Sequence, residues 1–186
     1  MDDDAVVPVA ARLIRDFVNT YEPQIDDETL TSPDGLRDWF AERRLLPADV
    51  PLGPADLDAA VTVREGLRAV LLGHAGHRAD PGAIDRLNHT LAAMPVAPRF
   101  TADGHRLVAT GHTPLDQAVA GLVDAIRECG TDGSWRRLKV CARDTCRWAY
   151  YDASRNQARR WCSMAGCGNH IKMRRAYAVR TGRAPS

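Results

Sequence analysis

Residues 138–180 read LKVCARDTCRWAYYDASRNQARRWCSMAGCGNHIKMRRAYAVR, and this stretch decides how the chain is organised. It holds four of the five cysteines in two pairs of equal spacing, Cys141-x4-Cys146 and Cys162-x4-Cys167, with fifteen residues between the pairs. Two local pairs of thiolates are what a tetrahedral zinc site needs, because each pair supplies two ligands about 2.3 Å from the ion. The stretch therefore predicts one structural zinc ion bound by Cys141, Cys146, Cys162 and Cys167.

Disulfides and a redox or iron–sulfur site stay open as other uses of these cysteines. Disulfides are typical of secreted chains, whereas this sequence begins MDDDAVVPVAARL, with acids where a signal peptide carries positive charge. No run approaches the roughly 18 apolar residues of a membrane span. We therefore expect a cytoplasmic protein without membrane contact, in which paired cysteines favour a metal. Four cysteine ligands leave no open coordination position, so the site is expected to be structural and not catalytic.

The charge of the chain is divided unevenly between its two halves. Residues 136–186 hold thirteen Lys/Arg and only two acids, whereas residues 1–135 hold twelve Lys/Arg and twenty-two acids. The net charge of +1 conceals this asymmetry. A strongly basic segment in such a chain indicates a polyanion as its partner.

The first 130 residues show the patterns of a helical domain. Apolar residues recur at helical spacing in several segments, and Ser32-Pro33 and Thr113-Pro114 have the composition of helix starts. The expected helices are Val6–Thr20, Ser32–Leu45, Ala55–Gly73, Asp80–Met94 and one from Thr113 to beyond Ile126. A hairpin is expected where Arg99–Thr101 and His105–Ala109 flank Ala102-Asp103-Gly104. A glycine-containing break, Gly130–Gly133, is the candidate hinge to the second domain.

The predicted fold is mainly α. It consists of a helical N-terminal domain (1–130) with a β-hairpin and a small C-terminal zinc finger (135–186) of ββα, treble-clef or ribbon type. Leu138–Val140 and Arg147–Tyr151 are its expected strands. Ser154-x-x-Gln157 resembles a capping box that opens a helix, and Asn169 is the expected cap of a last helix, His170–Arg180. These two helices carry the candidate nucleic-acid contacts Arg155, Arg159, Arg160, Lys172, Arg174, Arg175 and Arg180.

These residues carry a family resemblance. The first cysteine pair, Tyr151-Asp152-x-Ser154-Arg155-Asn156, Arg159–Met164 and Cys167-Gly168-Asn169 closely resemble the CGNR zinc finger. That finger ends bacterial proteins whose N-terminal part is an ABATE domain, which implies a stress-induced regulator of transcription. Asp16–Thr20 and Val63–Arg68 fit that partner domain. The motif's final arginine is His170 here, a weaker substitute for the arginine.

Several functional expectations follow. The finger is expected to bind duplex DNA, and the rival hypothesis is a protein-interaction module that docks an acidic partner, including the protein's own acidic half. Asn19, Arg64 and Arg68 are the candidate contacts for a small-molecule effector at the N-terminal domain. No paired base and nucleophile is apparent, so the chain is not expected to be an enzyme. A homodimer is expected. His74 and His77 are expected to be helix-end polar residues, and Cys129 a core residue.

Overall fold

The computed structural model describes residues 7–170, 172, 173, 177 and 180. Its α-helices lie where the sequence predicts them, within a few residues at each end. Side-chain caps fix two of the starts, because Ser32 Oγ accepts from the Gly35 amide and Thr113 Oγ1 from the Asp116 amide, both at 3.1 Å. The helices are α1 (Val9–Val18), α2 (Pro33–Glu42), α3 (Pro54–His74), α4 (Pro81–Ala92) and α5 (Pro114–Asp132).

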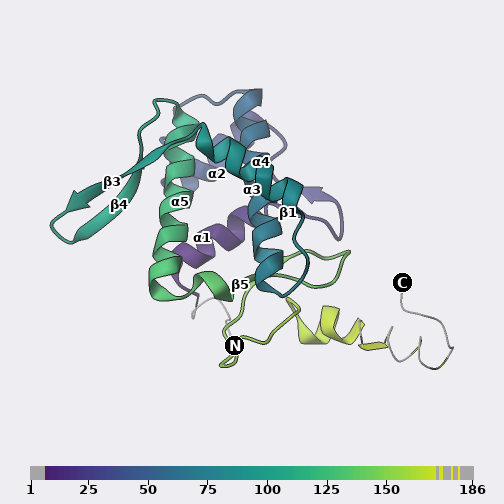
Figure 1. The fold of residues 1–186 in the computed structure, drawn as a ribbon. Coiled ribbons are helices and arrows are strands. Elements are labelled where there is room, and N and C mark those ends of the chain that lie inside the picture. The colour runs from purple at the N-terminus through teal and green to yellow at the C-terminus, as the bar shows by residue number, and fades with distance from the viewer. Residues whose placement is uncertain (1–6, 171, 174–176, 178–179, 181–186) are drawn as a thin grey trace.

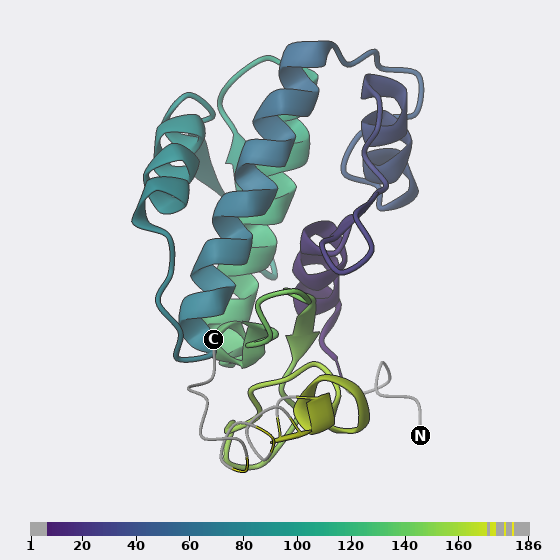
Figure 2. The ribbon, with the colours of Figure 1, turned by 90° about the vertical axis from the view of Figure 1, so that its right-hand side faces the viewer.

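The core lies between the two longest helices and the helices beside them. Helices α3 and α5 run side by side, with α1 and α2 on one side and α4 on the other (Figure 2). Phe17 of α1 packs on Trp39 of α2 with ring centroids 5.3 Å apart. Helix α4 approaches α3 so closely that a Cβ on Gly66 would lie 2.4 Å from Leu87 Cβ. Glycine at position 66 therefore sets the α3–α4 contact.

The predicted hairpin is confirmed and longer than expected. Strands β3 (Val96–Thr101) and β4 (Gly104–Ala109) pair antiparallel, and the hairpin extends away from the helices (Figure 1). The Leu107 amide donates to Asp124 Oδ1 of α5 at 2.8 Å, which fixes the base of the hairpin to the helix. A second, very short pair, β1 (Tyr21–Glu22) and β2 (Asp27–Glu28), follows α1.

The expected hinge is wrong, because the chain after α5 is packed into the helical core. Gly133 ends α5 at a φ of +77°, and the short 3-10 helix η2 (Trp135–Arg137) leads directly into β5 (Leu138–Val140). Strand β5 pairs antiparallel with β6 (Ala149–Tyr151). Three buried residues of this hairpin, Leu138, Val140 and Ala149, belong to the same apolar core as α1, α3 and α5. The finger thus begins inside the N-terminal domain.

The rest of the finger differs from the prediction in two respects. The helix expected from Ser154 is wrong, because residues 152–163 form an irregular loop in which Gln157 has a φ of +50°. The next regular element is a π-helical turn, η3 (Met164–Gly168), and it is capped by Ser163. Residues 169, 170, 172, 173, 177 and 180 are helical, so Asn169 belongs to the last helix and is not its N-terminal cap as expected.

In the part of the chain that the structure describes, we find no helix both long and apolar enough to span a bilayer.

Candidate metal centre and its surroundings

The four cysteines of the two pairs converge on one point. All their Sγ atoms lie within 4.8 Å of one another. Cys162 Sγ is 3.7 Å from Cys146 Sγ and 3.8 Å from Cys167 Sγ. Sulfurs at the corners of a tetrahedron around zinc are about 3.8 Å apart when each Zn–S bond is about 2.3 Å. The donor set and its spacing therefore fit one structural zinc ion, as the sequence predicts.

Each pair of cysteines lies in a turn whose backbone hydrogen bonds direct the thiols toward the cluster. The first pair lies in the turn between β5 and β6, where the Cys141 amide donates to the Trp148 carbonyl at 2.9 Å. Arg147, directly after Cys146, has a φ of +51°, which reverses the chain toward β6. In the second pair, the Gly166 amide donates to Ser163 Oγ at 3.1 Å, which starts the turn that carries Cys167.

Proximity of the sulfurs shifts their acidity. Hydrogen bonds from the Cys146 and Cys162 side chains lower the pKa of Cys141 to about 2. The same contacts raise the pKa of Cys162, because a second thiolate beside the first is unfavourable. The cluster thus retains protons until a cation neutralises the thiolates, so binding of zinc is coupled to proton release.

Arg143 supplies positive charge next to the cluster. Its Nη1 lies 3.9 Å from Cys167 Sγ and 3.4 Å from Gln24 Oε1 of the β1–β2 connection. Four thiolates around Zn²⁺ carry a formal charge near −2, so a guanidinium at this distance stabilises the site. No local pattern distinguishes Arg143 from the other basic residues of this segment, so it is not among the predicted site residues.

A buried ion pair organises the loop between the two cysteine pairs. Lys139 Nζ lies 2.8 Å from Asp152 Oδ2, and the side-chain exposures are 6% and 0%. Asp152 also accepts from the Ser154 amide at 3.1 Å and the Arg159 amide at 3.0 Å. Burial opposes ionisation, yet the hydrogen bonds from Lys139 and Ser154 prevail and lower the pKa of Asp152. Sequence reasoning missed this pair, although Asp152 is one of only two acids in the basic segment.

The predicted nucleic-acid residues fall into three groups. Arg159 is turned inward, where Nε donates to the Trp161 carbonyl at 2.9 Å and Nη2 donates to the Cys162 carbonyl. Its guanidinium also lies over the Tyr150 ring, 5.1 Å from the centroid. Arg174 and Arg175 lie outside the described residues. The exposed candidates are Arg155, Arg160, Lys172 and Arg180.

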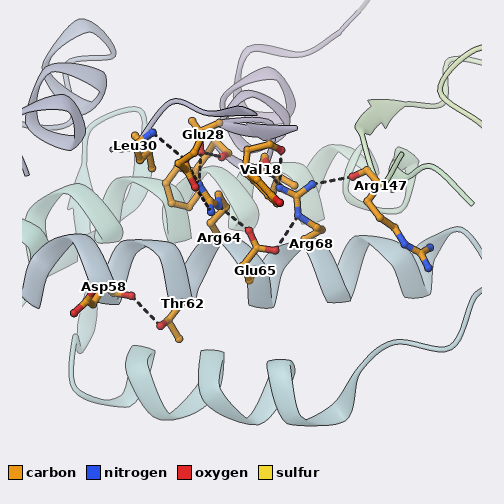
Figure 3. Close-up of polar contacts among 12 residues, drawn as sticks. Val18, Glu28, Leu30, Asp58, Thr62, Arg64, Glu65, Arg68 and Arg147 are labelled. Carbon is orange, nitrogen blue, oxygen red and sulfur yellow. Dashed lines mark hydrogen bonds and ion pairs between the residues drawn. The ribbon is translucent and has the colours of Figure 1, made fainter. Parts of the chain in front are cut away.

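Two of the candidate effector residues, Asn19 and Arg68, join the helical domain to the finger, and Asn19 also lines a cavity of about 380 Å³. Arg68 of α3 donates to the Val18 carbonyl at 2.5 Å and to the Arg147 carbonyl of the cysteine turn at 2.8 Å (Figure 3). Arg64 forms a two-bond ion pair with Glu28, 2.7 Å at each contact. Asn19 exchanges two hydrogen bonds with the backbone of Ala149, at 2.9 and 2.7 Å. These contacts give the three residues a structural role.

Both histidines at the end of α3 lie beside the finger. His74 donates through Nδ1 to the Leu138 carbonyl at 2.9 Å, and its ring meets Trp135 edge-on. His77 Nε2 is 3.4 Å from an Arg160 Nη2. Burial lowers the pKa of both rings. Neither histidine belongs to the cysteine cluster, and Cys129 is a buried core residue.

Family comparisons agree with this architecture. Residues 11–147 match the model of the ABATE family, whose description is "Putative stress-induced transcription regulator". The chain belongs to the ABATE family. Residues 137–180 of this ABATE protein match the CGNR zinc finger. The two matches overlap over β5 and the first cysteine pair, where the structure also merges the helical core with the finger. No curated protein matches the chain significantly.

Proposed function

We propose that this ABATE protein regulates transcription by binding duplex DNA through its zinc finger, under the control of a small molecule at the N-terminal domain. One observation supports DNA binding above all. Both acids of the basic segment are paired internally, Asp152 with Lys139 and Asp144 with Arg147 at 2.6 Å. The remaining positive charge of the finger therefore has no acid of its own segment to neutralise it. Such a surface attracts a phosphate backbone.

The proposed interface is smaller than the sequence predicts. Arg155 and Arg160 lie on the 152–163 loop, and Lys172 and Arg180 follow the second cysteine pair. A zinc ion would fix both segments, because Cys146 precedes the loop, Cys162 lies at its end and Cys167 precedes the helical residues. A rigid frame reduces the conformational entropy lost when arginines contact phosphates. Arg159, by contrast, supports the loop from within.

The test is a DNA titration of the full zinc-loaded chain, monitored by fluorescence anisotropy. Arg155→Ala with Arg160→Ala should weaken binding at least tenfold and reduce the slope of log K against log salt by about 2. The matched control is Arg37→Ala with Arg86→Ala, which removes the same charge from α2 and α4 and should leave the slope unchanged. Equal losses in both double variants would show only a response to net charge. Unchanged affinity in the finger variant would refute the interface.

Arg159 needs a separate variant. Arg159→Ala removes hydrogen bonds to the Trp161 and Cys162 carbonyls, so it should lower the stability of the finger and speed the loss of zinc to a chelator. Arg160→Ala should lower the affinity for DNA and leave the rate of zinc loss as in the wild type.

Exposed apolar side chains favour a second candidate, a protein-interaction surface. Met164, Met173 and Tyr177 are 48%, 73% and 54% exposed, and Met173 and Tyr177, four positions apart, are both helical. Such groups are typical of protein interfaces. Met173→Ser with Tyr177→Ser should leave the affinity for a short duplex intact if this surface contacts protein. Sedimentation of both forms tests the homodimer, which the variant should dissociate if the surface joins two copies.

A further inference from the structure

The N-terminal domain has a cavity whose chemistry differs from that of the finger. It lies between the β3–β4 hairpin, α5 and the segment after α2, and has a volume of about 480 Å³. Arginines from three different segments line it, namely Arg44, Arg99 and Arg106. Three guanidinium groups around one hollow are unexpected in a domain with an excess of acids.

Two of these arginines are held next to each other by the hairpin. Arg99 of β3 and Arg106 of β4 are direct partners in the antiparallel register, so their side chains leave the same face of the hairpin. Like charges directly opposite each other across two strands are unfavourable. An anion between or beside them would reverse that repulsion.

No acid of the described part of the chain pairs with these arginines. Among the described residues, none forms an ion pair or a side-chain hydrogen bond with the guanidinium groups of Arg44, Arg99 and Arg106. One carboxylate, Asp124, does line the cavity. Its Oδ1 already accepts from the Leu107 amide at 2.8 Å and from Arg127 Nε at 2.6 Å. Arg127 thus offsets the charge of Asp124, and the cavity stays positive.

The walls of the cavity are fixed before any ligand arrives. The Asp124–Leu107 hydrogen bond attaches β4 to α5. On the other side, Leu45 approaches α5 so closely that a Cβ on Gly121 would lie 2.6 Å from Leu45 Cδ2. The Arg44 amide donates to the Ala41 carbonyl at 2.9 Å, and Arg44 has a φ of +57°, so its backbone is held in a defined turn. A preformed site binds a ligand without a large ordering cost.

We propose that this cavity binds a small phosphate-bearing molecule through Arg44, Arg99 and Arg106. Planar guanidinium groups match phosphate oxygens in two-bond contacts, and the volume falls within the range of small-ligand pockets. Gln117, which also lines the cavity, adds a neutral hydrogen-bonding group. The site deepens the proposed function because it gives the N-terminal domain a ligand class, and the control of DNA binding by that ligand rests on the proposed function.

The test is calorimetric titration of the full zinc-loaded chain with inorganic pyrophosphate at low chloride concentration. We expect saturable binding at one site per chain. Arg99→Ala with Arg106→Ala should weaken it at least tenfold, and so should Arg44→Ala. Arg86→Ala, an exposed arginine of α4, is the matched control and should bind as the wild type does. Absence of saturable binding up to millimolar pyrophosphate, or equal affinity in all variants, would overturn the proposal.

Three further measurements distinguish a small-molecule site from a site for DNA phosphates. Without pyrophosphate, the zinc content of the Arg99/Arg106 variant should be unchanged, and its melting temperature should equal or exceed that of the wild type because the like-charge contact is removed. Pyrophosphate should then raise the melting temperature of the wild type alone. The DNA affinity of the Arg99/Arg106 variant, measured without pyrophosphate, should equal that of the wild type. A loss as large as that of the Arg155/Arg160 variant would identify DNA phosphates as the occupant and reject a small molecule. Pyrophosphate binding is measured without DNA, so either proposal can fail while the other stands.

Discussion

The Asn19 side chain pairs with the backbone of Ala149, 130 residues along the chain, through two reciprocal hydrogen bonds of 2.9 and 2.7 Å. The side-chain amide of Asn19 thus satisfies backbone groups of β6 that do not pair with β5. It joins the end of α1 to the finger at a point where the apolar core of the N-terminal domain also continues into the finger. A change that displaces α1 is therefore expected to shift the position of the cysteine turn as well.

Asn19→Ala should loosen this junction. It removes two hydrogen bonds of about 1 kcal/mol each and leaves the Ala149 amide and carbonyl without partners. We expect a loss of about 2 kcal/mol in unfolding free energy and faster hydrogen exchange at the Ala149 amide. Asn88→Ala on the exposed face of α4 is the control and should change neither. Unaltered exchange at Ala149 in the Asn19 variant would contradict this account.

The buried pair of Lys139 and Asp152 should be essential for the shape of the 152–163 loop. Asp152→Asn leaves a buried ammonium without a counter-charge, which typically costs about 3–5 kcal/mol. Urea unfolding measures the loss. The control is Asp144→Asn, since the Asp144 side chain is 90% exposed and its ion pair with Arg147 should contribute little. Equal losses of unfolding free energy in the two variants would show that the Lys139–Asp152 pair does not stabilise the loop.

His74 should make stability depend on pH. Burial lowers the pKa of its ring below the ordinary value near 6.5, while the neutral ring donates to the Leu138 carbonyl. The unfolded chain therefore takes up a proton at a higher pH than the folded one. The stability from His74 is complete above about pH 6.5 and declines as the pH falls toward the lowered pKa. Unfolding between pH 7.5 and 5.5 should show this decline, and His74→Asn should reduce it. A His77→Asn control accounts for the other shifted ring.

Loss of any one cysteine of the two pairs should release the metal. Cys141→Ser should lower the zinc content of the purified chain from one per molecule toward zero, because serine replaces a thiolate ligand. Cys129→Ala should retain one zinc, since Cys129 lies in the helical core outside the cluster. Native mass spectrometry distinguishes the two. Full zinc in the Cys141 variant would require a different ligand set.

The fold was predictable wherever local signals determine it. Ser32 and Thr113 mark helix starts through their own hydroxyl groups, and Asp103-Gly104 marks the hairpin, so these elements appear where the sequence places them. The cysteine pairs define the metal site through spacing alone. In each case the residues that cause the structure are close together in the chain.

The errors arise where distant residues override a local signal. Ser154-x-x-Gln157 resembles a helix cap, but the buried Asp152 takes up the Ser154 and Arg159 amides and holds the segment as a loop. The partners of Arg64 and Arg68, namely Glu28 and backbone carbonyls of α1 and the cysteine turn, are far from them in the sequence and could not be foreseen. The hinge at Gly133 could not be rejected from sequence, because the burial of β5 depends on α3. The three arginines of the N-terminal cavity come from separate segments and become a cluster only in the folded chain.

We propose above all that one zinc ion holds the 152–163 loop in the shape that binds DNA. The most direct measurement is a titration of the full chain with duplex DNA before zinc removal, after chelation, and after zinc is restored, with the zinc content measured in each sample. We predict that affinity falls at least tenfold when zinc is removed and returns with one ion per chain. DNA affinity and salt dependence that stay the same in the zinc-free chain would contradict the claim.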